Sequence, residues 1–443
     1  MSLDDILEAA ADAARSWARA DRAAALREVA DGIDAAADEL VPIAQEETHI
    51  PEARLRGEVV RTSFQLRLLA EEVQPRTVVD EADPSWPPAP RPKLVLTHRP
   101  IGPVLVFAAS NFPFAFSVAG GDTASALAAG CPVVLKAHPG HPRLSDATGE
   151  IVRSALPEGV FALIHSEEDG RAALTDPRVR AAAFTGSPTA GRALYDLAVS
   201  RPDPIPFYGE LGSVNPVFVT EAAARARGAE IAAGYVDSFT MGAGQLCTKP
   251  GLFVVPAGSG IGEAAAERVR QVAAAPLLNE RIASGYAAVL GRLVGHAEVR
   301  TLVDGGEAPT LLATTAKALL EHGEALRTEC FGPASLVVEY STESEMLDIV
   351  RSIDGQLTGT VQAEDDDPVA AELVDELAEH VGRVVWNGWP TGVAVTRAMH
   401  HGGPYPATTA PLHTSVGTAA VDRFRRPVAF QNVPEELLAD RIS

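Results

Sequence analysis

The chain has 443 residues, of which 46% are hydrophobic, and this predicts a globular protein of two or three domains. Its 37 basic and 59 acidic residues give a formal charge of −22, which argues against nucleic acid as a partner. Three cysteines without a pairing pattern favour a reducing compartment, so we expect a cytoplasmic protein. We see no signal peptide, and no apolar run approaches the roughly 20 residues of a membrane span.

Residues 3–49 are mostly helical by pattern, because apolar side chains recur at three- and four-residue spacing among charged ones. A third helix is predicted over about 52–73. Its basic residues, Arg61 among them, could simply form a solvated face. Residues 74–92 are rich in proline and acidic residues, which is typical of an extended connector. A strand is predicted over 93–98.

From residue 101 onward, short apolar runs alternate with helical stretches, and this alternation predicts a parallel, doubly wound sheet. The expected strands lie at 104–108, 133–136, 160–164 and 181–185. The expected helices lie at 117–130, 143–155 and 169–174. Ligands bind such sheets at the carboxyl ends of the strands. Three motifs fall at or just after those ends, and they contain Asn111, Lys136 and Gly186-Ser187.

The stretch from Met241 to Gly251 places Cys247 between two glycines and a Pro-Gly pair, which predicts a loop rather than a helix interior. The apolar run at 252–256 predicts a buried strand behind it. A thiol on such a loop suits a covalent nucleophile, provided that the site supplies a base or lowers the thiol pKa. The alternative is a small core residue, since free cysteine is often buried.

Two polar residues could assist such a nucleophile. Asn111, in Ser-Asn-Phe-Pro, could donate a hydrogen bond to a developing oxyanion, or it could only form a turn. Glu210 lies between glycines in Gly-Glu-Leu-Gly, and this tight, apolar setting predicts a raised pKa and a general base. A solvated turn carboxylate is the alternative for Glu210.

The segment from Phe184 to Gly191 runs from a strand end into a helix start, where Ser187 can cap the helix. Free N–H groups at that turn would suit a pyrophosphate, and a capped helix without a ligand is the alternative. The chain contains no GxGxxG fingerprint, so this motif alone is weak evidence. Glu329 is a second carboxylate in a turn, before a predicted strand at 335–338, and it could be an ordinary loop residue.

The order of these motifs resembles that of the aldehyde dehydrogenase superfamily. The six motifs span most of the chain and are Asn-Phe-Pro, a lysine at a strand end, Phe-Thr-Gly-Ser, Glu-Leu-Gly, Gly-Gln-x-Cys and Glu-x-Phe-Gly-Pro. More narrowly, the chain is similar to the α-ketoglutaric semialdehyde (2,5-dioxopentanoate) dehydrogenases. That similarity rests on the stretches 109–113, 116–134, 136–139, 209–216, 399–408 and 414–420.

The resemblance implies a role for each matched residue. Cys247 would attack the aldehyde carbon, and Asn111 with the N–H of Cys247 would form the oxyanion hole. Glu210 would activate the water that cleaves the thioester. The residues implied in binding NADP or NAD are Lys136, Gly186, Ser187, Gly191, Glu329 and Phe331. Phe112 and Arg61 would contact the substrate, and no metal ion is expected.

The resemblance also suggests the cofactor and the substrate. A carboxylate two or three residues after Lys136 would bind the ribose of NAD and repel a 2′-phosphate. His138 and Pro139 stand there instead, so we expect NADP to be at least as good a cofactor as NAD. The implied substrate is 2,5-dioxopentanoate, an anion that the overall charge repels. A local cation is therefore needed, and Arg61 is the candidate.

The implied fold is α/β, with a Rossmann-type cofactor domain, an α/β catalytic domain and a small oligomerisation arm. Their expected ranges are 1–90 with 99–212, 213–405, and 91–98 with 406–443. A homo-oligomer is expected, either a dimer or a tetramer. The chain departs from the family pattern because the N-terminal strands are absent and the stretch between the two site residues Cys247 and Glu329 is short. Another short or fatty aldehyde, a catalytically silent relative and a thioesterase-like hydrolase therefore stay open as alternatives.

Overall fold

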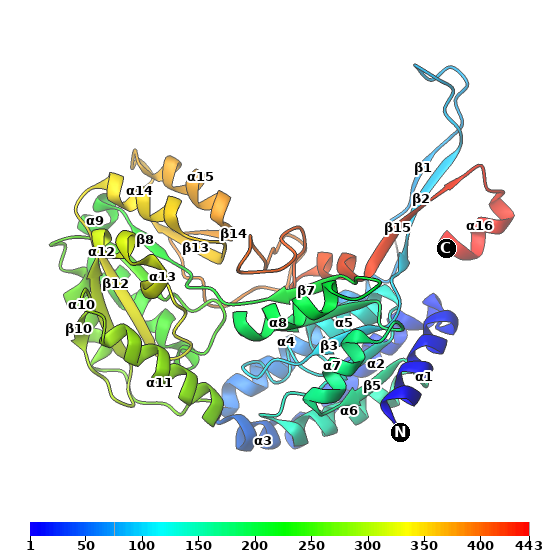
Figure 1. Ribbon diagram of the computed structural model, residues 1–443, viewed down its shortest axis with the longest axis horizontal. Coiled ribbons are helices and arrows are strands. Elements are labelled where there is room, and N and C mark those ends of the chain that lie inside the picture. The colour runs from blue at the N-terminus through cyan, green and yellow to red at the C-terminus, as the bar shows by residue number, and fades with distance from the viewer. Residues whose placement is uncertain (75, 443) are drawn as a thin grey trace.

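Two mainly parallel sheets, each covered by helices on both faces, organise the chain, and a small third sheet projects from one of them as an arm (Figure 1). The computed structural model describes residues 1–74 and 76–442. The α/β class predicted from the alternation of strands and helices is therefore confirmed. No helix within these described ranges is both long and apolar enough to cross a membrane.

The first sheet has the strand order β5-β4-β3-β6-β7, and all of its pairings are parallel. Its strands are β3 (Val104–Phe107), β4 (Val133–Lys136), β5 (Phe161–Ile164), β6 (Ala181–Thr185) and β7 (Phe207–Glu210). Successive side chains of a strand point to opposite faces, so Val104 and Val106 enter one core cluster and Leu105 enters another. The four strands predicted in this region are confirmed to within one residue at each end.

Helices bury both faces of this sheet. The helices on one face are α2 (Arg19–Ala35), α3 (Ala37–Thr48), α4 (Glu52–Ala70), α5 (Gly121–Ala129) and α6 (Pro142–Ser154). Those on the other face are α1 (Leu3–Ser16), α7 (Glu167–Thr175) and α8 (Pro188–Val199). The helix predicted over 52–73 is the fourth rather than the third, because breaks at Trp17 and Ala36 divide the first 49 residues into three helices.

The second sheet has the order β10-β11-β12-β9-β8-β13-β14, and only the β10–β11 pair is antiparallel. Its strands are β8 (Val217–Val219), β9 (Leu252–Pro256), β10 (Arg300–Val303), β11 (Thr310–Thr315), β12 (Ala334–Tyr340), β13 (Gln356–Gln362) and β14 (Val381–Trp386). On one face lie α9 (Glu221–Thr240) and α10 (Ile261–Val269). On the other face lie α11 (Glu280–Val294), α12 (Ala316–Glu321), α13 (Gly323–Leu326), α14 (Glu343–Ser352) and α15 (Ala370–His380).

The arm is a three-stranded antiparallel sheet in the order β1-β2-β15. Its strands are β1 (Val78–Asp80), β2 (Leu94–Pro100) and β15 (Arg425–Gln431), and the short helices η2 (Thr418–Phe424) and α16 (Glu435–Ile442) flank the last strand. The stretch predicted as an extended connector contributes β1, which is short and exposed and is held by its pairing with β2.

The candidate residues lie where the two large sheets approach each other. Asn111 and Ser187 follow β3 and β6, and Glu210 ends β7, so these residues lie at the carboxyl edge of the first sheet. Cys247 and Glu329 instead precede β9 and β12, at the amino edge of the second sheet. The fold therefore sets the carboxyl edge of one sheet against the amino edge of the other.

Glu58 of α4 fixes the loop that carries Asn111. Its buried carboxylate accepts hydrogen bonds at Oε1 from the backbone N–H of Phe114 at 2.8 Å and of Ala115 at 2.9 Å. Burial raises the pKa of Glu58, and these two N–H groups partly offset that rise. The loop after β3 is thus held by a side chain from a different layer.

We expect Glu58→Ala to lower the free energy of unfolding, because both backbone N–H groups then lie buried without a partner. Each such group costs about 1–3 kcal/mol. Urea unfolding followed by circular dichroism measures the loss, and Glu58→Gln, which keeps an acceptor oxygen, should lose much less. An alanine variant as stable as the wild type would show that these hydrogen bonds contribute nothing.

Candidate active site

The loop that carries Cys247 depends on glycine for its backbone conformation. Its first turn, η1 (Met241–Gly244), takes left-handed φ angles of +59° at Gly242 and +65° at Gly244. A Cβ on Gly244 would lie 2.2 Å from the carbonyl oxygen of Gly332, so a side chain does not fit there. Cys247 follows in a turn and is half-buried, as the glycines in the sequence predict.

Polar anchors hold this loop from two sides. The Asn215 Nδ2 donates to the carbonyl oxygens of Cys247 at 2.8 Å and Lys249 at 3.0 Å. Lys249 is 2% exposed, and its Nζ donates to the carbonyl oxygens of Cys330 at 2.7 Å and Ala334 at 2.9 Å. The thiol is therefore presented on a braced loop, and Lys249 ties that loop to the turn that carries Glu329.

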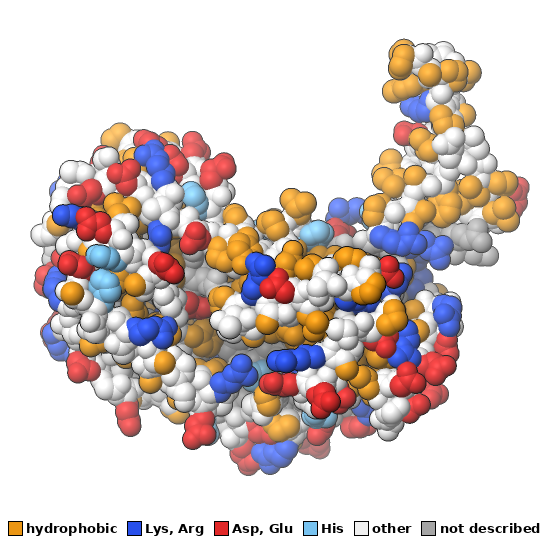
Figure 2. Space-filling view, in the orientation of Figure 1, with side chains coloured by type: hydrophobic (Ala, Val, Ile, Leu, Met, Phe, Trp, Pro, Cys, Tyr) orange, Lys and Arg blue, Asp and Glu red, His pale blue; other side chains and the backbone are white. Residues whose placement is uncertain are grey.

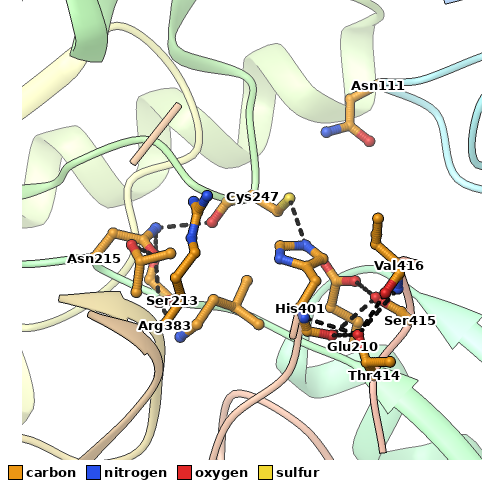
Figure 3. A network of polar contacts seen from close by, with 12 residues as sticks. Asn111, Glu210, Ser213, Asn215, Cys247, Arg383, His401, Thr414, Ser415 and Val416 are labelled. Carbon is orange, nitrogen blue, oxygen red and sulfur yellow. Dashed lines mark hydrogen bonds and ion pairs between the residues drawn. The ribbon is translucent and has the colours of Figure 1, made fainter. Parts of the chain in front are cut away.

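Three side chains from different parts of the chain meet at the thiol (Figure 3). The Sγ of Cys247 lies 3.6 Å from Nε2 of His401, and the same nitrogen lies 2.9 Å from Oε1 of Glu210. The Ser415 hydroxyl donates to the other carboxylate oxygen at 2.7 Å. Glu210 is 3% exposed and His401 is 1% exposed. The structure thus joins a thiol, an imidazole and a carboxylate in one buried cluster.

The pKa values in this cluster follow from burial and from the neighbouring charges. Burial raises the pKa of the Cys247 thiol well above its ordinary value, and the charge of Glu210 raises it further. Burial alone would also raise the pKa of Glu210, but the charge of His401 and hydrogen bonds from His401, Ser415 and Cys247 bring it below the usual value. The raised pKa predicted for Glu210 is therefore wrong, because the sequence does not reveal these partners.

Asn111 lies on the other side of the thiol from this cluster (Figure 3). Its Nδ2 donates one hydrogen bond, to the carbonyl oxygen of Gln245 at 3.0 Å, which leaves a second N–H on the same nitrogen. Gln245 is in turn held by its Oε1, which accepts from the backbone N–H of Leu278 at 2.8 Å. The amide is thus oriented by the nucleophile loop itself.

The candidate dinucleotide residues lie along the carboxyl edge of the first sheet. Lys136 ends β4 and is 8% exposed, and its ammonium has no hydrogen bond or ion pair to any described residue. Burial lowers its pKa. An ammonium without a partner in residues 1–74 and 76–442, at the end of a largely buried side chain, fits a polar or anionic ligand.

The turn before α8 offers fewer free donors than the sequence predicts. The N–H of Gly186 donates to the carbonyl oxygen of Glu210 at 3.1 Å, and that of Gly191 donates to Ser187 at 2.9 Å. The Ser187 hydroxyl caps the helix by accepting from Ala190, as predicted, and keeps its own O–H as a donor. Gly191 has a packing role, since a Cβ there would lie 2.1 Å from Leu211 Cδ2.

Glu329 faces this edge from the second sheet. Its Oε2 lies over Gly212, where a Cβ would come within 2.6 Å of it. Burial raises the pKa of Glu329 to about 7, although the charge of Lys249 and the backbone N–H of Ser213 lower it in part. Phe331, two residues on, is half-buried. This carboxylate could accept a hydrogen bond from a hydroxyl group, and a ribose has such hydroxyl groups.

The two candidate substrate residues lie near the thiol. Arg61 is half-buried, its guanidinium carbon lies 5.8 Å from the Phe116 ring centre, and its charge acts on both Cys247 and Glu210. The rings of Phe112 and Phe116 are 5.4 Å apart. The predicted residues are thus brought to one region from α4 and from the loop after β3.

Sequence reasoning gave no role to His401 or Ser415. His401 lies in the His-His-Gly-Gly-Pro stretch, where nothing in the spacing indicates its partner. Its Nε2, the Sγ of Cys247 and a carboxylate oxygen of Glu210 lie within 4.8 Å of one another, and among the described residues this is the one group of such side chains with the spacing to hold a metal ion. Only the return of the chain after β14, which pairs Thr408 with Glu210 in an isolated bridge, brings His401 to the thiol.

Comparisons with known proteins identify the family of the chain. The model of the aldehyde dehydrogenase family matches residues 1–405, so the chain belongs to that family. An α-ketoglutaric semialdehyde dehydrogenase 2 from Azospirillum brasilense is 44% identical over 451 residues, which cover 97% of this chain and 86% of that protein. An α-ketoglutaric semialdehyde dehydrogenase from Acinetobacter baylyi is 41% identical over 440 residues, covering 95% and 84%.

Solved structures share the fold at low sequence identity. The NADP-dependent glyceraldehyde-3-phosphate dehydrogenase from Bacillus halodurans C-125, complexed with NADP, has a TM-score of 0.82 at 20% identity, covering 97% of this chain and 91% of that one. Aldehyde dehydrogenase 21 from Physcomitrella patens, in complex with the reaction product succinate, has a TM-score of 0.80 at 24% identity, covering 97% and 90%.

We expect iodoacetamide to label Cys247 alone in the folded protein, and to do so slowly at neutral pH. Cys131 and Cys330 are buried, and burial raises the pKa of each to about 11. The thiolate is the reactive form, so labelling of Cys247 should rise with pH to beyond 9. Mass spectrometry gives the rate, and Cys247→Ser should abolish it. A labelling rate that already levels off near pH 7 would contradict the raised pKa.

Proposed function

We propose that the protein oxidises 2,5-dioxopentanoate to 2-oxoglutarate with NADP or NAD, through a covalent intermediate on Cys247. The observation that carries the proposal is the cluster of the Cys247 thiol, the His401 imidazole and the Glu210 carboxylate, with the Asn111 amide on the other side of the thiol. The substrate is supported by two relatives, at 44% and 41% identity, that are named α-ketoglutaric semialdehyde dehydrogenases.

In the first step the Cys247 sulfur attacks the aldehyde carbon. Its proton passes to Glu210, whose carboxylate has an oxygen within 4.8 Å of the sulfur. The carbonyl oxygen becomes an oxyanion, and the second N–H of Asn111 donates to it. One such donor is worth about 3–4 kcal/mol in other enzymes. The thiol thus stays neutral and protonated at rest. It loses its proton and becomes a nucleophile as the sulfur attacks the aldehyde carbon.

Bound NADP or NAD would supply the oxidising chemistry by accepting the hydride of the former aldehyde carbon, and a thioester would remain on Cys247. Glu210 releases its first proton to solvent and then accepts a proton from water as the water oxygen attacks the acyl carbon. The carbon–sulfur bond breaks, the carboxylic acid leaves and the thiol regains a proton. His401 and Ser415 hold the Glu210 carboxylate in place through both steps.

The residues at the edge between the sheets fit a dinucleotide. Lys136 offers to the adenosine ribose region an ammonium that has no partner within the described chain. Ser187 offers a hydroxyl donor to the pyrophosphate at the start of α8, beside Gly186 and Gly191. Glu329, with Phe331 next to it, would accept hydrogen bonds from the nicotinamide ribose.

The substrate carboxylate would be bound by Arg61, with Phe112 lining the aldehyde path. Arg61 comes from the helix that borders the nucleophile loop, and no carboxylate of a described residue lies within ion-pair distance of its guanidinium. An anion that approaches a protein of charge −22 depends on such a local cation. Arginine is suited to the task because its planar fork binds a carboxylate with two hydrogen bonds.

A homo-oligomer built through the arm is also part of the proposal. The arm sheet presents exposed Val78, Val79 and Leu96, and Figure 2 shows apolar side chains along it. Unpaired outer strands of a projecting sheet invite pairing with another chain. Analytical ultracentrifugation separates a dimer or tetramer from a monomer. The three free cysteines support a reducing, cytoplasmic location.

We expect the purified protein to reduce NADP or NAD when 2,5-dioxopentanoate is added, with absorbance of the reduced cofactor as the measurement. Cys247→Ala should abolish turnover. Glu210→Gln removes the base but keeps the shape, so the thioester should accumulate and be visible by intact mass spectrometry. Near-normal turnover in Cys247→Ala, or no reduction with any short aldehyde, would refute the proposal. Ester hydrolysis without any dehydrogenase signal would favour a hydrolase instead.

We expect kcat/KM with NADP to be at least equal to that with NAD. No carboxylate follows Lys136 at positions 138 and 139, so none repels a 2′-phosphate there. His138 contributes no charge, because burial lowers its pKa to about 3, and the favourable charges are those of Lys136 and Arg281. Initial rates with each cofactor decide the matter. A large preference for NAD would refute this part.

A further inference from the structure

Two guanidinium groups, one from a helix that covers the first sheet and one from a strand of the second sheet, converge on one loop near the thiol. Arg61 of α4 donates from Nη1 to the carbonyl oxygen of Val393. Arg383 of β14 donates from Nη2 to Pro390 at 2.6 Å and from Nη1 to Gly392 at 3.4 Å. The segment 390–393 therefore lies between the two arginines and is held by both.

Both arginines lack an anionic partner. Neither has a carboxylate within ion-pair distance among the described residues, and the Nε of each is buried without a hydrogen-bond acceptor. By contrast, Arg351 of α14, which covers the sheet that contains Arg383, is paired with Glu372 and Glu376. Desolvating a charge is costly unless a partner compensates it. Two half-buried, unpaired cations in an acidic protein therefore indicate an anion that is not part of the chain.

The position of these cations relates that anion to the reacting thiol. Burial lowers the pKa of Arg383, and the one ionisable group that offsets this effect is Cys247. Burial likewise lowers the pKa of Arg61; the charge of the buried Glu58 offsets this effect most, and those of Cys247 and Glu210 follow. Figure 3 shows Arg383 beside the Cys247 loop, on the opposite side from His401 and Glu210. His401 and Glu210 thus lie on one side of the thiol, and the arginine lies on another.

Not every nearby arginine is available. Arg54 donates from Nη2 to the carbonyl oxygen of Asn111 at 2.7 Å, and its guanidinium carbon lies 5.1 Å from the Phe112 ring centre. It is engaged in holding the loop after β3. Arg61 and Arg383 bind only loop carbonyls, and a guanidinium carries five N–H donors. Each of these two therefore keeps donors for a ligand.

We infer that Arg383 and Arg61 form a two-guanidinium subsite that binds the 2-oxo acid end of the substrate while the aldehyde lies at Cys247. This inference rests on the proposed function and adds Arg383 as a specificity residue. The carboxylate and the adjacent 2-oxo oxygen of a 2-oxo acid provide acceptors for both guanidiniums. A semialdehyde with a carboxylate but no 2-oxo group satisfies fewer of these donors, and an uncharged aldehyde satisfies none.

The test compares 2,5-dioxopentanoate, succinate semialdehyde and pentanal in steady-state assays of the wild type, Arg383→Met, Arg61→Leu and the double variant. We expect each single variant to raise KM for 2,5-dioxopentanoate by about 10- to 100-fold, as for loss of a charged hydrogen bond. KM for pentanal should change by less than about twofold. Arg300→Met, on the surface of the same sheet, is the matched control and should change neither KM.

A second measurement does not depend on turnover. The product 2-oxoglutarate should slow iodoacetamide labelling of Cys247 in the wild type, and this protection should be lost in Arg383→Met. Arg383→Lys keeps the charge but not the planar fork, so it should recover protection in part. This variant also shows whether the position tolerates a long side chain, should the methionine variant fail to fold.

The outcomes separate this inference from the proposed function. If the wild type oxidises none of the three aldehydes, the proposed function fails. If the wild type oxidises 2,5-dioxopentanoate and Arg383→Met raises KM equally for that substrate and for pentanal, then Arg383 only supports the loop and the subsite is refuted. The subsite is also refuted if 2-oxoglutarate protects Cys247 equally in the wild type and in Arg383→Met.

Discussion

The buried carboxylate of Glu210 is the group on which the site depends. It ends β7 and accepts hydrogen bonds from His401 and Ser415 of the returning C-terminal segment, and the Sγ of Cys247 lies within 4.8 Å of one of its oxygens. The backbone continues the same contact, because Leu211 donates to Ala407 at 2.7 Å. A carboxylate this deeply buried is tolerated only with such partners. One charge therefore joins the first sheet, the nucleophile loop and the C-terminal segment.

This arrangement gives the thiol a particular resting state. Glu210 and Glu329 both raise the pKa of Cys247, whereas Arg61 acts in the opposite direction and is the smaller influence. The protonated thiol is therefore favoured until its proton is transferred. A carboxylate whose pKa lies below the usual value is a weak base, but Glu210 has an oxygen within 4.8 Å of the sulfur whose proton it accepts in the proposed mechanism. Proximity compensates for low basicity, and an inactive thiol is protected from unwanted oxidation.

The sequence predicted what depends on neighbours along the chain. The strands of the first sheet, the glycine-dependent loop at Cys247 and the Ser187 cap all follow from local patterns. His401 was not predictable because it meets Cys247 across 154 residues and Glu210 across 191. The predicted rise in the pKa of Glu210 was wrong for the same reason. The helix breaks near Trp17 and Ala36 were missed because alanine-rich sequence on both sides favours continuing the helix.

Each of the two sheets contributes both to the proposed chemistry and to the proposed substrate subsite, but the residues of the two functions form separate groups. The carboxyl edge of the first sheet carries Asn111 and Glu210, and the amino edge of the second carries Cys247. Arg61 and Arg383 come from α4 and from within β14, and they meet only at the loop 390–393. A change at either arginine leaves the thiol, the carboxylate and the amide with all their hydrogen bonds. Substrate choice can therefore change without altering the groups that form and cleave the thioester.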